Sequence, residues 1–120
     1  MNDYKSYTQR DKKQMHYSPN LINVIQNAID NRLLASIEYD SREKGITERN
    51  VEPFALVYKE GKRNLVGFCH LRNEYRSFRL DRINLVKLRK ETFDFRPDFN
   101  ADDFADTNES NGNENYESDY

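Results

Sequence analysis

One short segment carries three arginines within seven residues, a grouping that suits recognition of anions. It reads Arg76-Ser77-Phe78-Arg79-Leu80-Asp81-Arg82-Ile83. A guanidinium group matches phosphate oxygens with two parallel hydrogen bonds and also stacks on bases. We therefore expect Arg76, Arg79 and Arg82 to hold an anionic ligand, and nucleic acid or a nucleotide suits them best.

Asp81 leaves a second interpretation open, because an aspartate between Arg79 and Arg82 can anchor a bend through an ordinary ion pair. Alternation in an unbroken strand places Arg76 on the face of Phe78 and Arg79 on the other face. If Phe78 fills the core, Arg76 should lie at the barrel rim or reach along a groove, because a buried unpaired charge is costly. A bend near Asp81 then brings Arg82 toward the same mouth.

The residue types that usually carry catalysis or hold metals are sparse. His16 and His70 are the two histidines, and neither has a nucleophile and an orienting group at a recognisable spacing. Cys69 is the single cysteine, so no internal disulfide can form and no Cys/His spacing resembles a zinc site. We expect no catalytic residues, no metal and no cofactor, and a protein that is not an enzyme.

The formal net charge of -2 conceals two opposed blocks. Residues 1–96 contain all 19 Lys and Arg against 13 Asp and Glu, a net charge of +6, whereas residues 97–120 contain 8 acidic groups and no basic one. A basic body attracts phosphates, and an acidic run is usually a solvated tail. No apolar run could span a membrane or act as a signal peptide, so we expect a cytoplasmic protein.

Apolar spacing predicts one helix followed by strands. Ser18 and Pro19 suit the N-cap and first helical position, and a stripe at spacings of three and four continues through about Leu33. The period then drops to two in five runs. These runs cover residues 35–40, 46–51, 54–59, 64–70, and 75–79 continuing past a bend to 85–89.

One helix and five short antiparallel strands favour an α+β fold, a small curled barrel with the helix across one open end. We expect the barrel domain to span residues 18–96. Residues 1–17 form a basic, tyrosine-bearing arm and residues 97–120 an acidic tail, both predicted to be disordered.

Three blocks in this order resemble the WYL domain family over roughly Leu21 to Phe95. They are Arg49-Asn50-Val51-Glu52-Pro53, then the block from Gly61 to Cys69, then the arginine segment. The resemblance implies an Sm-like or SH3-like five-stranded barrel with an N-terminal helix. It also implies a sensor of nucleic acid or nucleotide-like ligands in bacteria and phages, found in transcription regulators and in phage-defence systems.

Carried over by position, the resemblance implies that the ligand-facing residues are Arg49, Arg76, Arg79, Arg82, Tyr58 and His70. The sequence departs from the family at the motif that names it, where Arg63-Asn64-Leu65 stands in place of Trp-Tyr-Leu. Arg63 therefore adds a charge to the candidate ligand-binding residues.

Two functions fit these features. The first is a non-enzymatic regulatory module that binds single-stranded DNA or RNA, or a nucleotide, through the arginine cluster. The alternative is a protein-interaction adaptor that docks on a larger effector protein through the barrel or the acidic tail. A homo-oligomer is compatible with both.

Overall fold

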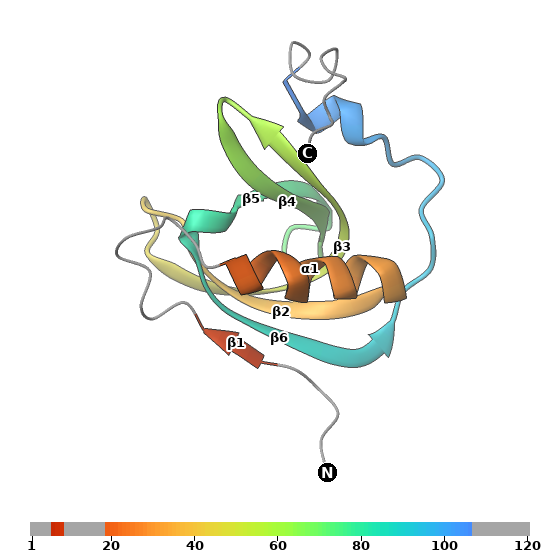
Figure 1. The fold of residues 1–120 in the computed structure, drawn as a ribbon, viewed down its shortest axis with the longest axis horizontal. Coiled ribbons are helices and arrows are strands. Elements are labelled where there is room, and N and C mark those ends of the chain that lie inside the picture. Colours follow the sequence, from red (N-terminus) through yellow and green to blue (C-terminus); the bar gives the residue numbers. More distant parts are fainter. Residues whose placement is uncertain (1–5, 9–18, 107–120) are drawn as a thin grey trace.

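One helix and a curved antiparallel sheet make up the computed structural model, which describes residues 6–8 and 19–106 (Figure 1). The α+β class predicted from the sequence is confirmed. No helix of this described part is long and apolar enough to cross a membrane. In chain order the elements are β1 (Ser6–Thr8), α1 (Pro19–Asn31), β2 (Leu33–Asp40), β3 (Ile46–Lys59), β4 (Lys62–Cys69), β5 (Glu74–Arg79), η1 (Leu80–Arg82), β6 (Ile83–Thr92) and η2 (Ala101–Phe104).

Helix α1 packs its apolar stripe against the sheet, as its spacing predicts. Leu21, Ile25 and Ala28 are buried in the core. The helix ends at Asn31, because Arg32 adopts a left-handed conformation (φ 54°) that leads the chain out of the helix. Residue 33, predicted to end the stripe, instead begins strand β2. The predicted N-cap at residue 18 lies outside the described residues.

Strand β3 unites two of the predicted strands, residues 46–51 and 54–59. Its pairing with β4 shifts register between Pro53 and Ala55, and this bulge accommodates a proline that cannot donate to the sheet. The predicted fifth strand is instead two strands joined by η1. β5 pairs with β4, and β6 pairs with β2, so the two lie at different places in the sheet.

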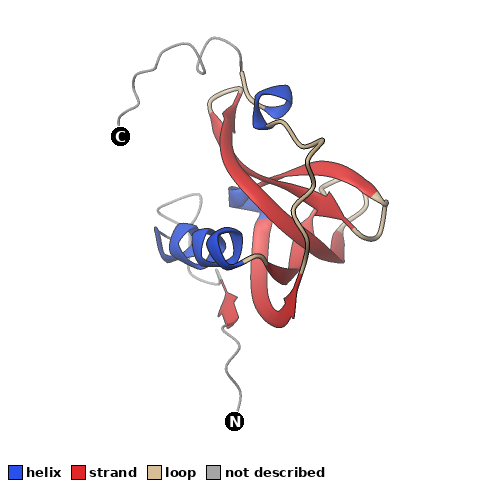
Figure 2. Cartoon of the chain, turned by 90° about the vertical axis from the view of Figure 1, so that its right-hand side faces the viewer, coloured by secondary structure: helices blue, strands red, loops and turns tan. Residues whose placement is uncertain are grey.

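The predicted barrel is not closed. The strand order is β1-β6-β2-β3-β4-β5, so β5 and β1 form the two edges of the described sheet. The sheet curls strongly, and α1 lies across its open side (Figure 2). Within the arm predicted to be disordered, Ser6–Thr8 pair with β6, which the sequence did not predict; the rest of the arm lies outside the described residues.

Alternate residues of the strands fill the space between sheet and helix. Each strand from β2 to β6 points apolar side chains inward, and these form one buried cluster with residues of α1. The most deeply buried side chains belong to Leu21, Ile37, Val51, Leu65, Leu80 and Ile83.

After β6, residues 93–106 cross the outer face of the sheet, and we call this segment the C-terminal strap (Figure 2). The Phe99 ring stacks on Phe54 and Phe104, with centroids 5.0 and 6.0 Å away. At its end, the Asp106 amide donates to the Tyr58 carbonyl (3.1 Å). The folded structure therefore continues past residue 96, where the sequence placed the start of the tail.

Gly67 allows β4 to approach β3 closely beside the bulge. A Cβ at this position would clash with the Glu52 carbonyl oxygen and lie 2.6 Å from the Val51 side chain. We expect Gly67→Ala to lower the free energy of unfolding by about 2–3 kcal/mol, measured by urea denaturation. Lys87→Ala, at an exposed strand position, should change it by less than about 0.5 kcal/mol. Equal effects of the two substitutions would contradict this packing.

Candidate anion-binding site

A pocket of about 230 Å³ opens between the β2–β3 turn and strand β5. It brings together two of the predicted site residues, Arg49 of β3 and Arg76 of β5. We call it the arginine pocket. Its polar lining comprises Tyr39, Lys44, Arg49, Arg72, Arg76 and Ser77, among others.

Arg49 is the deepest charged group of this pocket and is only 5% exposed. Its Nε donates to the Thr47 hydroxyl (3.3 Å), and its Nη1 contacts the Cys69 sulfur (3.7 Å). Its guanidinium carbon lies 5.9 Å from the centre of the Phe78 ring. Among the described residues, no carboxylate lies within ion-pair distance of Arg49. A buried charge is costly unless it is paired, and Arg49 is the buried arginine of this pocket that lacks an acidic partner among the described residues.

Arg76 lies at the rim, as strand alternation predicts. It shares a face of β5 with Phe78, which is 2% exposed, while the Arg76 side chain is 39% exposed. Its Nη1 donates to the Glu74 carboxylate (2.8 Å). Exposed ion pairs contribute little, so a ligand can compete for this guanidinium. Arg72, in the β4–β5 turn, and Lys44, in the β2–β3 turn, extend the rim. The sequence did not indicate Lys44 as a site residue, because only the pairing of β2 with β3 brings the β2–β3 turn to the mouth of the pocket.

A hydroxyl group supplies a neutral donor beside these cations. The Tyr39 hydroxyl accepts the backbone N–H of Arg79 (3.1 Å), and its own hydrogen is not used in any bond observed within the described residues. Ser77 also lines the pocket, but alternation along β5 turns its side chain to the face opposite Arg76. The Tyr39 ring meets Phe78 edge to face, with centroids 5.1 Å apart, which fixes the hydroxyl in place.

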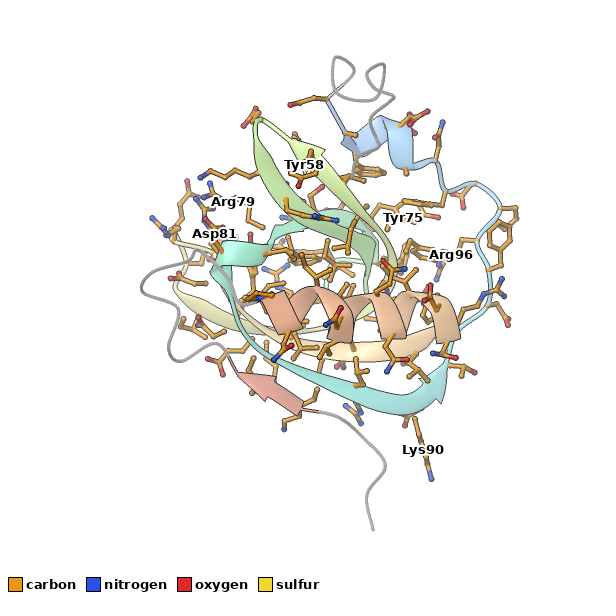
Figure 3. The ribbon with its side chains drawn as sticks, in the orientation of Figure 1. Tyr58, Tyr75, Arg79, Asp81, Lys90 and Arg96 are labelled. Carbon is orange, nitrogen blue, oxygen red and sulfur yellow. The ribbon has the colours of Figure 1, made fainter. Side chains whose placement is uncertain are left out.

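Arg79 is held by Asp81 rather than by the pocket (Figure 3). Its Nε and Nη2 donate to the two carboxylate oxygens, at 3.0 and 2.6 Å. These hydrogen bonds lower the pKa of Asp81 below its ordinary value and outweigh the opposing effect of burial. The interpretation of Asp81 as the anchor of a bend therefore holds for Arg79.

Three other predicted residues also lie outside the arginine pocket. The predicted bend exists as η1, but Arg82 at its end is not among the lining residues. Tyr58 and Arg63 face each other across the β3–β4 hairpin, where Arg63 Nη1 donates to the Tyr58 hydroxyl (3.2 Å). The guanidinium of Arg63 lies 5.1 Å from the Tyr58 ring centre. The predicted cluster is therefore divided among separate places.

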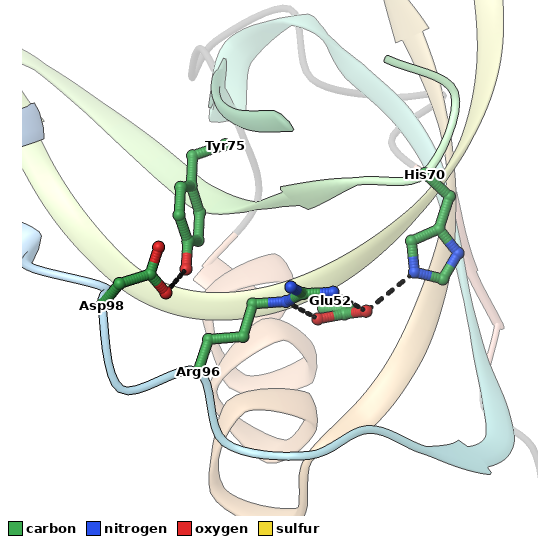
Figure 4. A network of polar contacts seen from close by, with 5 residues as sticks. All are labelled: Glu52, His70, Tyr75, Arg96 and Asp98. Atoms are coloured by element: carbon green, nitrogen blue, oxygen red, sulfur yellow. Dashed lines mark hydrogen bonds and ion pairs between the residues drawn. The ribbon is translucent and has the colours of Figure 1, made fainter. Parts of the chain in front are cut away.

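His70 belongs to a different network on the outer face of the sheet (Figure 4). Its Nε2 lies 2.9 Å from the Glu52 carboxylate. Arg96 of the strap donates to both oxygens of the same carboxylate (2.7 and 3.2 Å) and stacks on Phe68, 3.7 Å from the ring centre. Sequence reasoning did not identify Glu52 or Arg96, because 44 residues separate the two partners and no local spacing signals their contact.

The lowered pKa of Glu52 is consistent with an ion pair that anchors the strap to the sheet. Burial tends to raise the pKa of Glu52, but hydrogen bonds from Arg96 and His70 outweigh it and hold the pKa below its ordinary value. Nearby, burial and a hydrogen bond to Asp98 (2.7 Å) raise the pKa of Tyr75 to about 12. A second pocket, of about 520 Å³, lies here, but the charged Glu52 and Arg96 in its lining already pair with each other.

A comparison with protein-family models identifies one family. A family model described as the WYL domain matches residues 20–88. The uncharacterized HTH-type transcriptional regulator YobV of Bacillus subtilis (strain 168) is 36% identical over 78 residues. That match covers 65% of this chain and 25% of the relative, so the chain spans about a quarter of the relative's length.

A solved structure supports the fold alone. The proteasome accessory factor B/C (PafBC) of Arthrobacter aurescens superposes with a TM-score of 0.57 at 22% sequence identity. The superposition covers 71% of this chain and 13% of that one.

The ion pair between Glu52 and Arg96 should make stability depend on pH. Because the folded-state pKa of Glu52 is lowered, ionised Glu52 stabilises the fold above its unfolded-state pKa, and this contribution is lost as pH falls through the folded-state pKa. We expect Glu52→Gln to cost about 2 kcal/mol at pH 7.

The difference between wild type and Glu52→Gln should shrink as the pH is lowered below about 4, measured by urea denaturation across pH. Glu91→Gln is the matched control, because Glu91 is exposed and lies 3.7 Å from Arg89. It should change stability by less than about 0.5 kcal/mol. A pH-independent cost for Glu52→Gln would contradict the assigned role.

Proposed function

Because the chain belongs to the WYL domain family, we propose that it is a regulatory, ligand-sensing module of transcription control. It binds an anionic ligand, either single-stranded nucleic acid or a nucleotide, in the arginine pocket. It acts in the cytoplasm and catalyses no reaction. Its curved sheet and single helix support a grouping with the Sm-like and SH3-like barrels.

The observation that carries this proposal is the buried guanidinium of Arg49, which has no carboxylate partner among the described residues. Arg79 and Arg96, whose side chains are 30% and 37% exposed, each pair with an acid. An anion that entered the pocket would give Arg49 the partner it lacks, and Arg72, Arg76 and Lys44 would surround that anion at the rim.

Nucleic acid is the proposed polyanion for two reasons. An arginine beside an exposed aromatic ring, here Arg63 beside Tyr58, offers both charge and a stacking surface. The relative YobV is named as an HTH-type transcriptional regulator, which supports a regulatory setting. The seven residues expected to face the ligand now divide into a primary pair, Arg49 and Arg76, and peripheral candidates Arg79, Arg82, Tyr58, His70 and Arg63.

The proposal of a non-enzymatic role rests on how potential catalytic groups are used. Cys69 is fully buried, and His70 is engaged with Glu52. Among the described residues, no group of three or more His, Cys, Asp or Glu side chains could hold a metal ion.

A protein-interaction adaptor remains the second candidate, because β5 forms an edge of the described sheet. An edge strand presents backbone N–H and C=O groups that a partner strand can pair with. An adaptor should keep its protein partner when Arg72 and Arg76 are both replaced by alanine, whereas a nucleic-acid module should lose its ligand.

Binding of a fluorescent single-stranded oligonucleotide of about eight residues tests the proposal. We expect Arg72→Ala and Arg76→Ala each to weaken binding about tenfold at low salt, measured by fluorescence anisotropy. Each substitution should also reduce the slope of log K against log salt by about 0.7, because one phosphate contact is lost.

Lys90→Ala is the matched control, since it removes one exposed positive charge outside both pockets (Figure 3). It should leave affinity within about twofold of wild type. Arg79→Ala should lower stability more than affinity, because its partner is Asp81. No binding to single-stranded DNA or RNA or to nucleotides at low salt, or equal losses for Arg76→Ala and Lys90→Ala, would overturn the proposal.

A further inference from the structure

We propose that the arginine pocket selects a phosphomonoester, the group at a phosphorylated end of a single strand or on a free nucleotide, over the phosphodiesters within a strand. This inference rests on the proposed function and names the ligand group that the site accepts. Three features of the pocket carry it, namely its size, its charge and its donors.

The pocket is too small for a whole oligonucleotide. Its volume of about 230 Å³ lies below the roughly 300–1,000 Å³ of sites that enclose complete small ligands. Buried residues also close the inner end of the pocket. Arg49 contacts Cys69, which is fully buried, and Phe78 is 2% exposed. A chain end can enter such a blind pocket, whereas an internal phosphodiester would need a path for the strand to enter and leave.

The charge of the pocket matches a dianion. Four cationic side chains line it, Lys44, Arg49, Arg72 and Arg76. Two acids oppose them, Glu43 in the lining and Glu74 on Arg76, which leaves an excess of two positive charges. A phosphomonoester carries a charge of about −1.5 to −2 at pH 7, and each internal phosphodiester carries a single negative charge.

The number of donors also favours a terminal phosphate. A phosphomonoester presents three strong acceptor oxygens. The guanidinium groups of Arg49 and Arg76 supply directional donors from the floor and the rim, and the Tyr39 hydroxyl adds a neutral one. The Tyr39 hydroxyl already accepts the Arg79 N–H, so its own hydrogen is available to donate to a different acceptor. A phosphodiester has only two unesterified oxygens, so it can accept hydrogen bonds from fewer of these donors.

Matched oligonucleotides test the inference with the full chain. The probes are one single-stranded sequence of about eight nucleotides with a 5′-phosphate, with a 3′-phosphate or with hydroxyls at both ends, and the corresponding nucleoside monophosphate as competitor. We expect at least one phosphorylated form to bind about tenfold more tightly than the form with two hydroxyl ends. The preferred end identifies the strand direction.

Variants distinguish binding in the arginine pocket from nonspecific electrostatic attraction of the probe to the protein surface. Arg76→Gln, at the partly exposed rim, should remove most of the preference for the phosphorylated probe, and Tyr39→Phe should reduce it while retaining the aromatic ring. Lys90→Ala should leave the preference unchanged, because Lys90 is exposed and lies outside the lining. Urea denaturation of each variant confirms that the fold is retained.

Each outcome has a distinct meaning. Equal affinity for phosphorylated and unphosphorylated strands overturns the phosphomonoester inference and leaves nucleic-acid binding intact. Binding of the nucleoside monophosphate without any strand supports the inference and assigns the group to a free nucleotide. Failure of every probe to bind at low salt rejects the inference and the proposed function together.

Discussion

The alternation of side chains along β3 and β4 is the constraint on which both polar sites depend. Arg49 and Val51 point toward the core side, and Glu52 points to the outer face, where Arg96 meets it. Cys69, the last residue of the paired strand β4, contacts Arg49, and the next residue, His70, contacts Glu52. A slip of one residue would exchange the two faces and destroy both sites, so the register of this strand pair has to be exact to the residue.

The distribution of acids decides what each arginine can do. Arg79 and Arg96 each have a carboxylate at hydrogen-bond distance, so their charge is used to hold a bend and a strap. Arg49 has none among the described residues, and the partner of Arg76 is exposed and easily displaced. The candidate site is therefore indicated by the burial of Arg49 together with the lack of a nearby acid, and not by the density of arginines along the sequence.

Local patterns in the sequence predicted much of the fold, since helix and strand periods depend on neighbouring residues. They indicated the helix from Pro19, the strands and the place of Arg76 at a rim. They failed where long-range pairing decides the result. Separate strands were expected on the two sides of Pro53, yet a bulge lets one strand continue through it. Arg82 was expected at the mouth but does not line the pocket. The direction that the chain takes through a turn such as η1 cannot be predicted from its sequence.

The full extent of the C-terminal strap was not predicted, because residues 97–106 were assigned to the acidic tail. Its phenylalanines stand among acidic residues, so composition suggested a solvated tail, whereas Phe99 packs on Phe54 of a distant strand. This route has a mechanical consequence. A pull applied beyond residue 106 meets the aromatic stack and then the clamp of Arg96 on Glu52 before any tension reaches β6. The strap thus passes such a force to β3, through Phe54 and Glu52, and keeps it from β6.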